Sequence, residues 1–153
     1  MTGSANPAIT AESIAAMLAD TAPSYPHDLG IEPLSIDDDH AAGRMVVDER
    51  HLHPGKLVHG GAWVGFADSV AAWQTFRHLP PGANFTTIEL KLNAFAGAAH
   101  GDVLTARAEH LHAGRSTHVV EVRIDRVRGG GEPRRAANLL VTQFVIPAPD
   151  QPG

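Results

Sequence analysis

The sequence of residues 60–76 is GGAWVGFADSVAAWQTF, and this stretch decides the fold. It is apolar nearly all round, and its large side chains recur at helical spacing: Trp63, Phe66, Val70 and Trp73. The run Leu79-Pro80-Pro81-Gly82 follows it and stops a helix. A helix that is apolar on every side must be buried, so we expect one long central helix wrapped by a curved sheet.

The segments on both sides of this stretch predict strands and turns. Before it, residues 29–36 and 42–47 predict two strands joined by an acidic turn at 37–39. After it we expect four strands, 86–94, 103–111, 120–125 and 136–146, with turns at 113–114 and 129–131. Within residues 86–94, alternation places Ile88 on the face of Leu90 and Thr87 on the opposite face.

The N-terminal part predicts one short helix and a loop. Residues 11–19 form an amphipathic run behind Thr10, and Ser13 in place of the usual Glu predicts only a partial cap. Residues 20–28 contain two prolines and predict a loop.

Helices that stand apart from hairpin-linked strands predict an α+β fold with an antiparallel sheet. We expect one domain over residues 10–147, a disordered segment 1–9 and a flexible tail 148–153.

Composition excludes several classes of function. The chain has 153 residues, which suits one domain, and a net charge of −5, which argues against nucleic-acid binding. It contains no cysteine, so disulfides, thiolate nucleophiles and Cys-based zinc sites are excluded. Neither a signal peptide nor a membrane-spanning run is recognisable. We therefore expect a soluble cytoplasmic protein with no membrane partner.

Asp68 is the only ionisable residue in the predicted central helix. A carboxylate buried among apolar side chains is costly unless it is paired or hydrogen-bonded, and such groups concentrate at functional sites. Two other interpretations are open. Asp68 could be a polar anchor bonded to backbone amides, or it could face solvent through a gap in the sheet.

The start of the helix, His59-Gly60-Gly61, offers backbone amides at the positive end of the helix dipole. Glycine lets a ligand approach the backbone closely, and an amide aimed at a carbonyl oxygen can act as an oxyanion hole. The alternative is that the glycines only let the chain turn into the helix.

Gly60 and Asp68 are eight residues apart, which is about 12 Å along one helix at ~1.5 Å per residue. One carbonyl group cannot touch both. If they act together, Asp68 must come from a second subunit whose helix runs antiparallel to the first, which predicts a two-fold dimer. Three alanines would let two such helices approach: Ala67, Ala71 and Ala72.

The run His53-Pro54-Gly55-Lys56-Leu57-Val58-His59-Gly60-Gly61 followed by Asp68 resembles the hotdog-fold thioesterases. The branch is that of the phenylacetate-pathway and Arthrobacter-type 4-hydroxybenzoyl-CoA thioesterases. The resemblance covers about residues 28–146 and includes the Gly101-Asp102 turn and the segment 114–117. It implies a hotdog fold, dimers or dimers of dimers, and hydrolysis of an acyl-CoA to a free acid and CoA. It implies no cofactor and no metal; coenzyme A enters as part of the substrate.

The resemblance also implies roles for residues around the helix start. The Gly60 N–H would polarise the thioester carbonyl, and Gly61 would let the substrate approach the backbone. Asp68 of the partner subunit would attack the carbonyl or activate water, and the sequence leaves both routes open. His59 would fix the loop and the helix start. His53 stands where Asn or Gln is usual, and as a neutral imidazole it can still orient water.

Four further residues are candidates for substrate binding. In the family the Gly-Arg turn lies by the nucleotide end of CoA, which implicates Gly114 and Arg115, and Arg suits phosphate through its charge and planar fork. Ser116 could add a hydroxyl there. Thr87 is a weaker candidate, which could line the acyl pocket or bind a water molecule.

Three other hypotheses compete with this one. The side chains of His51, His53, His59 and Asp68 could bind a metal ion. A hotdog enoyl-CoA hydratase or dehydratase would need a His paired with an acid, and the spacing fits thioesterases better. A non-catalytic acyl-CoA binding module would be expected to lack the acid, which is present as Asp68.

Overall fold

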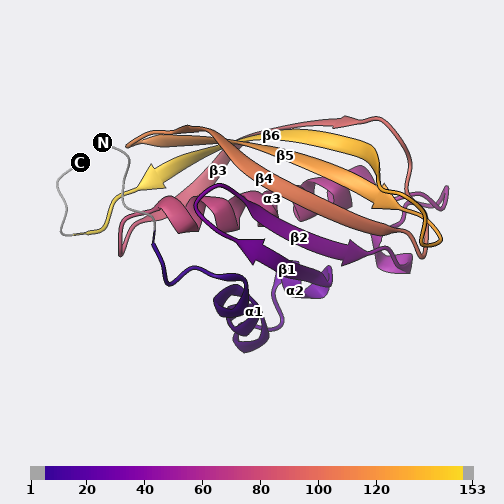
Figure 1. The fold of residues 1–153 in the computed structure, drawn as a ribbon, viewed down its shortest axis with the longest axis horizontal. Coiled ribbons are helices and arrows are strands. Elements are labelled where there is room, and N and C mark those ends of the chain that lie inside the picture. Colours follow the sequence, from indigo (N-terminus) through magenta and orange to yellow (C-terminus); the bar gives the residue numbers. More distant parts are fainter. Residues whose placement is uncertain (1–5, 150–153) are drawn as a thin grey trace.

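A six-stranded antiparallel sheet wraps around one long helix in the computed structural model of the chain, which describes residues 6–149 (Figure 1). The helices are α1 (Ala11–Asp20), α2 (Tyr25–Asp28) and α3 (Gly60–His78), with a 3-10 turn η1 (Glu49–His51). The strands, in spatial order, are β1 (Ile31–Ile36), β2 (Ala41–Val46), β4 (Val103–Ala113), β5 (Thr117–Val127), β6 (Arg134–Ile146) and β3 (Asn84–Ala94). The predicted hotdog architecture, with its short N-terminal helix, is confirmed.

The helix α3 lies against the concave face of the sheet, and its four large apolar side chains are buried there as predicted: Trp63, Phe66, Val70 and Trp73. The helix comes close to β2 because Gly43 has no side chain. A Cβ at Gly43 would lie 2.8 Å from Val70 Cγ2 and 2.9 Å from Trp73 Cζ3. None of the helices within residues 6–149 is long and apolar enough to cross a bilayer.

The first two helices differ from the prediction at their ends. The Thr10 hydroxyl accepts the Ser13 N–H at 3.2 Å and the Ser13 hydroxyl accepts the Thr10 N–H at 2.9 Å. The capping box of α1 is therefore complete, because a Ser side chain can serve the role of Glu. Residues 25–28, predicted as a loop, form the single turn α2, since Pro26 falls in the first helical positions, where proline is tolerated.

The strand β3 contains a bulge that turns its side chains. Its register with β6 shifts between Thr87 and Glu89. Because the bulge inserts an extra residue, Thr87 points toward the helix and Ile88 is 58% exposed. The prediction that Ile88 shares the inward face of Leu90 is wrong, since strict alternation does not hold across a bulge.

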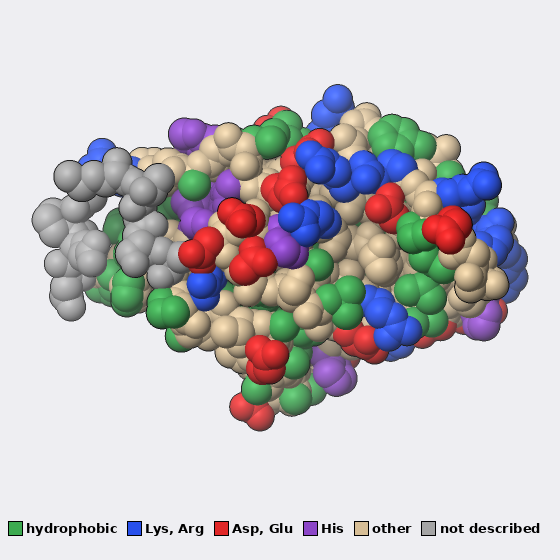
Figure 2. Space-filling view, viewed as in Figure 1, with side chains coloured by type: hydrophobic (Ala, Val, Ile, Leu, Met, Phe, Trp, Pro, Cys, Tyr) green, Lys and Arg blue, Asp and Glu red, His purple; other side chains and the backbone are tan. Residues whose placement is uncertain are grey.

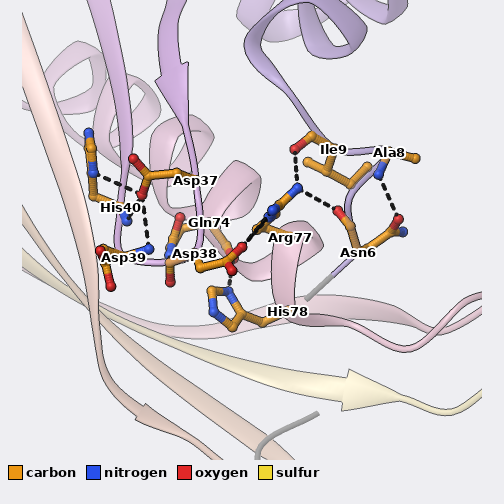
Figure 3. A network of polar contacts seen from close by, with 10 residues as sticks. All are labelled: Asn6, Ala8, Ile9, Asp37, Asp38, Asp39, His40, Gln74, Arg77 and His78. Carbon is orange, nitrogen blue, oxygen red and sulfur yellow. Dashed lines mark hydrogen bonds and ion pairs between the residues drawn. The ribbon is translucent and has the colours of Figure 1, made fainter. Parts of the chain in front are cut away.

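Arg77 in the last turn of α3 holds two other segments in place (Figure 3). Its Nε donates to Asp38 Oδ1 at 2.9 Å in the β1–β2 turn, which confirms the predicted acidic turn. Its Nη1 donates to the carbonyl oxygens of Asn6 at 2.9 Å and Ile9 at 3.2 Å. Residues 6–9, part of the segment predicted to be disordered, are thereby bonded to α3. Residues 1–5 and 150–153 of the predicted tails lie outside the described residues.

A cluster of histidines lies between the end of α3 and the sheet. His110 Nε2 and His118 Nδ1 share a hydrogen bond of 2.9 Å, and the rings of His78 and His110 meet edge to face at 4.7 Å. Burial, and after it the neighbouring imidazoles, lower the pKa of His110 to about 3. His110 is therefore neutral at physiological pH.

We expect this cluster to make the fold sensitive to mild acid. In the unfolded chain His110 titrates near 6.5, whereas in the fold its pKa is about 3. The unfolded state therefore binds the proton first, and stability is lost as pH falls from 6.5 toward 3. The pKa of His118 is lowered too, and it adds to the loss in the same direction. Urea unfolding at pH 7.5 and 5.0 would measure the effect, and His110→Gln should shrink the difference. An equal difference in that variant would contradict the assignment.

Candidate active site

The loop before α3 is anchored by His51, which is fully buried. Its Nδ1 accepts the Asp48 N–H at 2.9 Å, so its Nε2 carries the proton and donates to the Leu29 carbonyl at 2.9 Å. The His51 carbonyl in turn accepts the His59 N–H at 2.8 Å. Both ring nitrogens of His51 are thus used to place the start of the helix. The sequence raised this residue only as a metal ligand.

His59 caps α3. Its Nδ1 accepts the Gly61 N–H at 2.9 Å, the bond that an N-cap Ser or Asp would make. The Gly60 N–H, in contrast, has no hydrogen-bond acceptor among residues 6–149. Gly60 is exposed, and a Cβ built on it would have no atom of this chain within 4 Å. The free amide at this helix terminus therefore belongs to Gly60.

His53 shapes the turn that precedes the cap. Its Nδ1 accepts the Gly55 N–H at 2.9 Å, and its backbone N–H donates to the Leu57 carbonyl at 2.9 Å. Because a backbone amide can only donate, the neutral His53 ring carries its proton on Nε2. The half-buried ring thus keeps one free donor.

Asp68 lies in the middle of α3 and bonds to Thr87 on β3. The Thr87 hydroxyl donates to Asp68 Oδ1 at 2.9 Å. This contact exists because the bulge at residues 87–89 turns Thr87 inward. Thr87 is thus the orienting partner of the carboxylate. The sequence suggested Thr87 only for the acyl pocket or for water.

Burial raises the pKa of Asp68 above its ordinary value of 3.8, and the hydrogen bond from Thr87 opposes this shift. No cation offsets the burial within the chain, since the described residues place no ion-pair partner on Asp68. A desolvated, half-buried carboxylate with one fixed oxygen is well suited to accept a proton or attack a carbonyl.

The sheet leaves one side of α3 partly uncovered. The helix residues on this side, before its last turn, are Gly60, Gly61, Val64, Asp68 and Ala72. Ala67 and Ala71 are fully buried against the sheet of their own chain. The expectation that these two alanines would meet a second helix is therefore wrong, and of the three only Ala72 lies on the uncovered side.

The structure does not unite all the predicted site residues. Gly60 and Asp68 remain on one continuous helix, about 12 Å apart along its axis. The exposed Arg115 and Ser116, with Gly114, form the β4–β5 turn. The Ser116 carbonyl accepts the Val145 N–H beside the start of β3, and Phe85 of β3 packs on Phe76 near the end of α3. That turn therefore lies at the opposite end of the helix from Gly60 (Figure 1).

No three His, Asp or Glu side chains within residues 6–149 are grouped as ligands for a metal ion. His51, His53 and His59 each use Nδ1 to accept a backbone N–H. These bonds serve the loop and the helix cap, which is a structural use of the three imidazoles.

Comparison with known families decides the reaction class. Residues 55–131, which include the helix start, Asp68 and Thr87, match the thioesterase superfamily. The chain belongs to this superfamily. Its chemistry is thioester hydrolysis.

Thioesterase relatives match over much of the chain. Thioesterase PA1618 of Pseudomonas aeruginosa is 32% identical over 126 residues, covering 82% of this chain and 83% of that protein. The crystal structure of a mutant of that enzyme gives a TM-score of 0.76 over 87% of this chain and 93% of the other.

Two further relatives have names that state a substrate. The 1,4-dihydroxy-2-naphthoyl-CoA hydrolase of Listeria monocytogenes is 31% identical over 96 residues, 63% of this chain and 77% of the relative. The acyl-coenzyme A thioesterase PaaI of Escherichia coli is 33% identical over 97 residues, 63% of this chain and 66% of the relative.

Proposed function

We propose that this thioesterase hydrolyses acyl-CoA esters at two equivalent sites of a two-fold dimer. In each site the Gly60 N–H of one subunit binds the thioester carbonyl oxygen, and Asp68 of the other subunit supplies the carboxylate. The observation that carries this proposal is the pairing of a free helix-terminal amide with a desolvated carboxylate about 12 Å further along the same helix.

Two features of the fold favour the dimer. The strand β3 is an edge strand of eleven residues, Asn84–Ala94, so one row of its backbone groups is free to pair with a second copy. Asp68 and Ala72 lie on the side of α3 that the sheet leaves uncovered, next to that edge. Antiparallel pairing of two β3 strands would bring two α3 helices together along this side.

The reaction then needs three tasks from the protein. The Gly60 amide stabilises negative charge as the carbonyl becomes tetrahedral. Asp68 either removes a proton from the attacking water or attacks the carbonyl itself to give an anhydride that water opens. In both routes the C–S bond breaks, the acid and CoA leave, and CoA takes up a proton at sulfur. His53, whose Nδ1 is used by the Gly55 N–H, keeps its Nε2–H free and would orient the water or the carbonyl.

An aryl-CoA of the phenylacetate or hydroxybenzoate type is the substrate class that we propose. The run from His53 to Asp68 supports this branch, and the relatives named for 1,4-dihydroxy-2-naphthoyl-CoA and acyl-coenzyme A are consistent with it. We place CoA, rather than a separate cofactor, at the site, and we place Arg115 of the β4–β5 turn near its nucleotide end.

Thiol release over a panel of aryl-, short-chain and medium-chain acyl-CoAs tests the proposal. We expect turnover with at least one aryl-CoA and a faster rate than with unbranched acyl chains of similar size. Tight binding of every ester without thiol release would point to a binding module instead. Hydration of an enoyl-CoA added to the panel, without release of thiol, would point to a hydratase.

A further inference from the structure

The β5–β6 turn carries a basic cleft that the proposed reaction has not used. The cleft measures about 400 Å³ and is lined by Arg126, Arg128, Gly131, Glu132 and Arg134. Lys and Arg side chains gather at this end of the molecule (Figure 2). Three guanidinium groups therefore face one open space against a single carboxylate.

The strand register concentrates this charge. Arg126 on β5 lies directly opposite Arg134 on β6, so the two side chains leave the same face of the hairpin. Arg128 follows the end of β5 directly and lines the same cleft. Like charges placed directly across a ladder destabilise the pair, and an anion bound between them would relieve the repulsion.

The chain itself neutralises only part of the charge. Arg128 is paired with Asp102, with its Nη2 at 2.7 Å from Oδ2. Arg126 Nη1 donates to the Gly97 carbonyl, which carries no net charge, and its buried Nε has no acceptor. The exposed side chain of Arg134 makes no hydrogen bond or ion pair with residues 6–149. Arg126 lies within the field of Asp102, but that carboxylate is already bonded to Arg128, so Glu132 is the remaining carboxylate that lines the cleft beside Arg126 and Arg134.

The cleft lies at the end of the molecule where α3 begins. Arg126 bonds to Gly97, and a Cβ at Gly97 would lie 3.1 Å from Leu57 Cδ1 in the loop before the helix. The next residue, Ala98, accepts the Val58 N–H at 2.8 Å. Only His59 separates Val58 from Gly60 and the free amide, so the basic cleft and the Gly60 amide share one end of the protomer.

We propose that this cleft binds the phosphate groups of the CoA portion of the substrate. The proposal rests on the acyl-CoA thioesterase function above. CoA carries a diphosphate and a 3′-phosphate, and guanidinium groups bind phosphate oxygens through charge and paired N–H donors. The pantetheine arm connects these phosphates to a thioester held at Gly60.

The proposed dimer brings a second basic residue to the same end. If Gly60 of one subunit meets Asp68 of the other, the partner's α3 extends past Gly60 toward its own C-terminus. The β4–β5 turn with Arg115 lies beside that C-terminus. The cleft of one subunit and Arg115 of the other then act on the same nucleotide from two sides.

Arg134→Gln tests the proposal, with Arg135→Gln as its matched control. Arg135 is the next residue along β6 and pairs with Asp125, with 2.7 Å between Nε and Oδ1. Calorimetric titration with adenosine 3′,5′-bisphosphate should show binding about fivefold weaker in Arg134→Gln and unchanged in Arg135→Gln. The affinity of the wild type should also depend more steeply on salt concentration than that of Arg134→Gln. Equal affinity in both variants would overturn the proposal.

Kinetics separate this site from the catalytic one. We expect Arg134→Gln to raise KM for an acyl-CoA about fivefold, with kcat retained. Turnover of the matching acyl-N-acetylcysteamine thioester should be unchanged, because that ester has no phosphate. Equal losses on both esters would contradict phosphate binding. Inorganic phosphate that binds as tightly as the bisphosphate would also overturn the assignment to CoA. If no thioester is turned over, the proposed function fails, and the bisphosphate titration still decides whether the cleft binds phosphate.

Discussion

Asp68→Asn is expected to lower kcat for acyl-CoA hydrolysis by about 10²–10⁴-fold, the contribution typical of a positioned acid–base group. Asn keeps the size of the side chain and its oxygen can still accept the Thr87 hydroxyl, so the fold and the KM should change little. What it loses is the ability to accept a proton or to attack the carbonyl. Steady-state thiol release, with circular dichroism to check the fold, measures the effect.

The same variant should be more stable than the wild type at neutral pH. Burial raises the pKa of Asp68, so the ionised carboxylate is less favourable in the fold than in the unfolded chain. This cost is present above the folded pKa and disappears as pH falls below the ordinary value of 3.8. Asn removes this cost of ionisation. A gain of about 1 kcal/mol in the free energy of unfolding would raise Tm by roughly 2–4 °C for a chain of this size. Unchanged turnover in Asp68→Asn would refute the role of this residue, whatever the Tm.

Gly60→Pro should lower kcat by about 10²–10³-fold, the loss typical when one oxyanion donor is removed. Gly60 is the first residue of α3, where proline is well tolerated because no intrahelical bond uses its N–H. The preceding His59 has φ −65° and ψ 143°, the conformation that a residue before proline prefers. The substitution therefore removes one N–H with little expected disturbance of the helix.

Gly60→Ala is the matched control for this variant. It adds a Cβ where no atom of the chain lies within 4 Å, and it keeps the N–H. We expect it to retain most of the turnover of the wild type, measured with the same acyl-CoA. Equal activity of the Ala and Pro variants would show that the amide is not the oxyanion donor.

The elements of the fold were predictable because their patterns are local. The apolar run from Trp63 to Trp73 and the stop at Pro80 define a buried helix without knowledge of its surroundings. The strands alternate, and glycines mark the turn at residues 129–131. His59-Gly60-Gly61 and Asp68 also stood out, because glycines at a helix start and a lone carboxylate in an apolar helix are unusual in any context.

The contacts between elements could not be read from the sequence. The bond from Thr87 to Asp68 depends on a bulge, which arises from the register between β3 and β6 and not from residues 86–94 alone. Likewise, a helix that is apolar all round does not reveal which side faces its own sheet. For that reason the sequence alone does not distinguish alanines that face a second helix from Ala67 and Ala71, which are buried within their own chain.

Subunit complementation tests the shared site most directly. Asp68→Asn and Gly60→Pro chains would be mixed by co-expression or by joint refolding, and acyl-CoA turnover would be compared with each variant alone. In a mixed dimer one site carries both substitutions and the other carries neither. Random pairing makes about half of the dimers mixed, each with one intact site, so about a quarter of the wild-type activity should be restored. Activity no greater than the average of the two variants alone would contradict a site built from Gly60 of one subunit and Asp68 of the other.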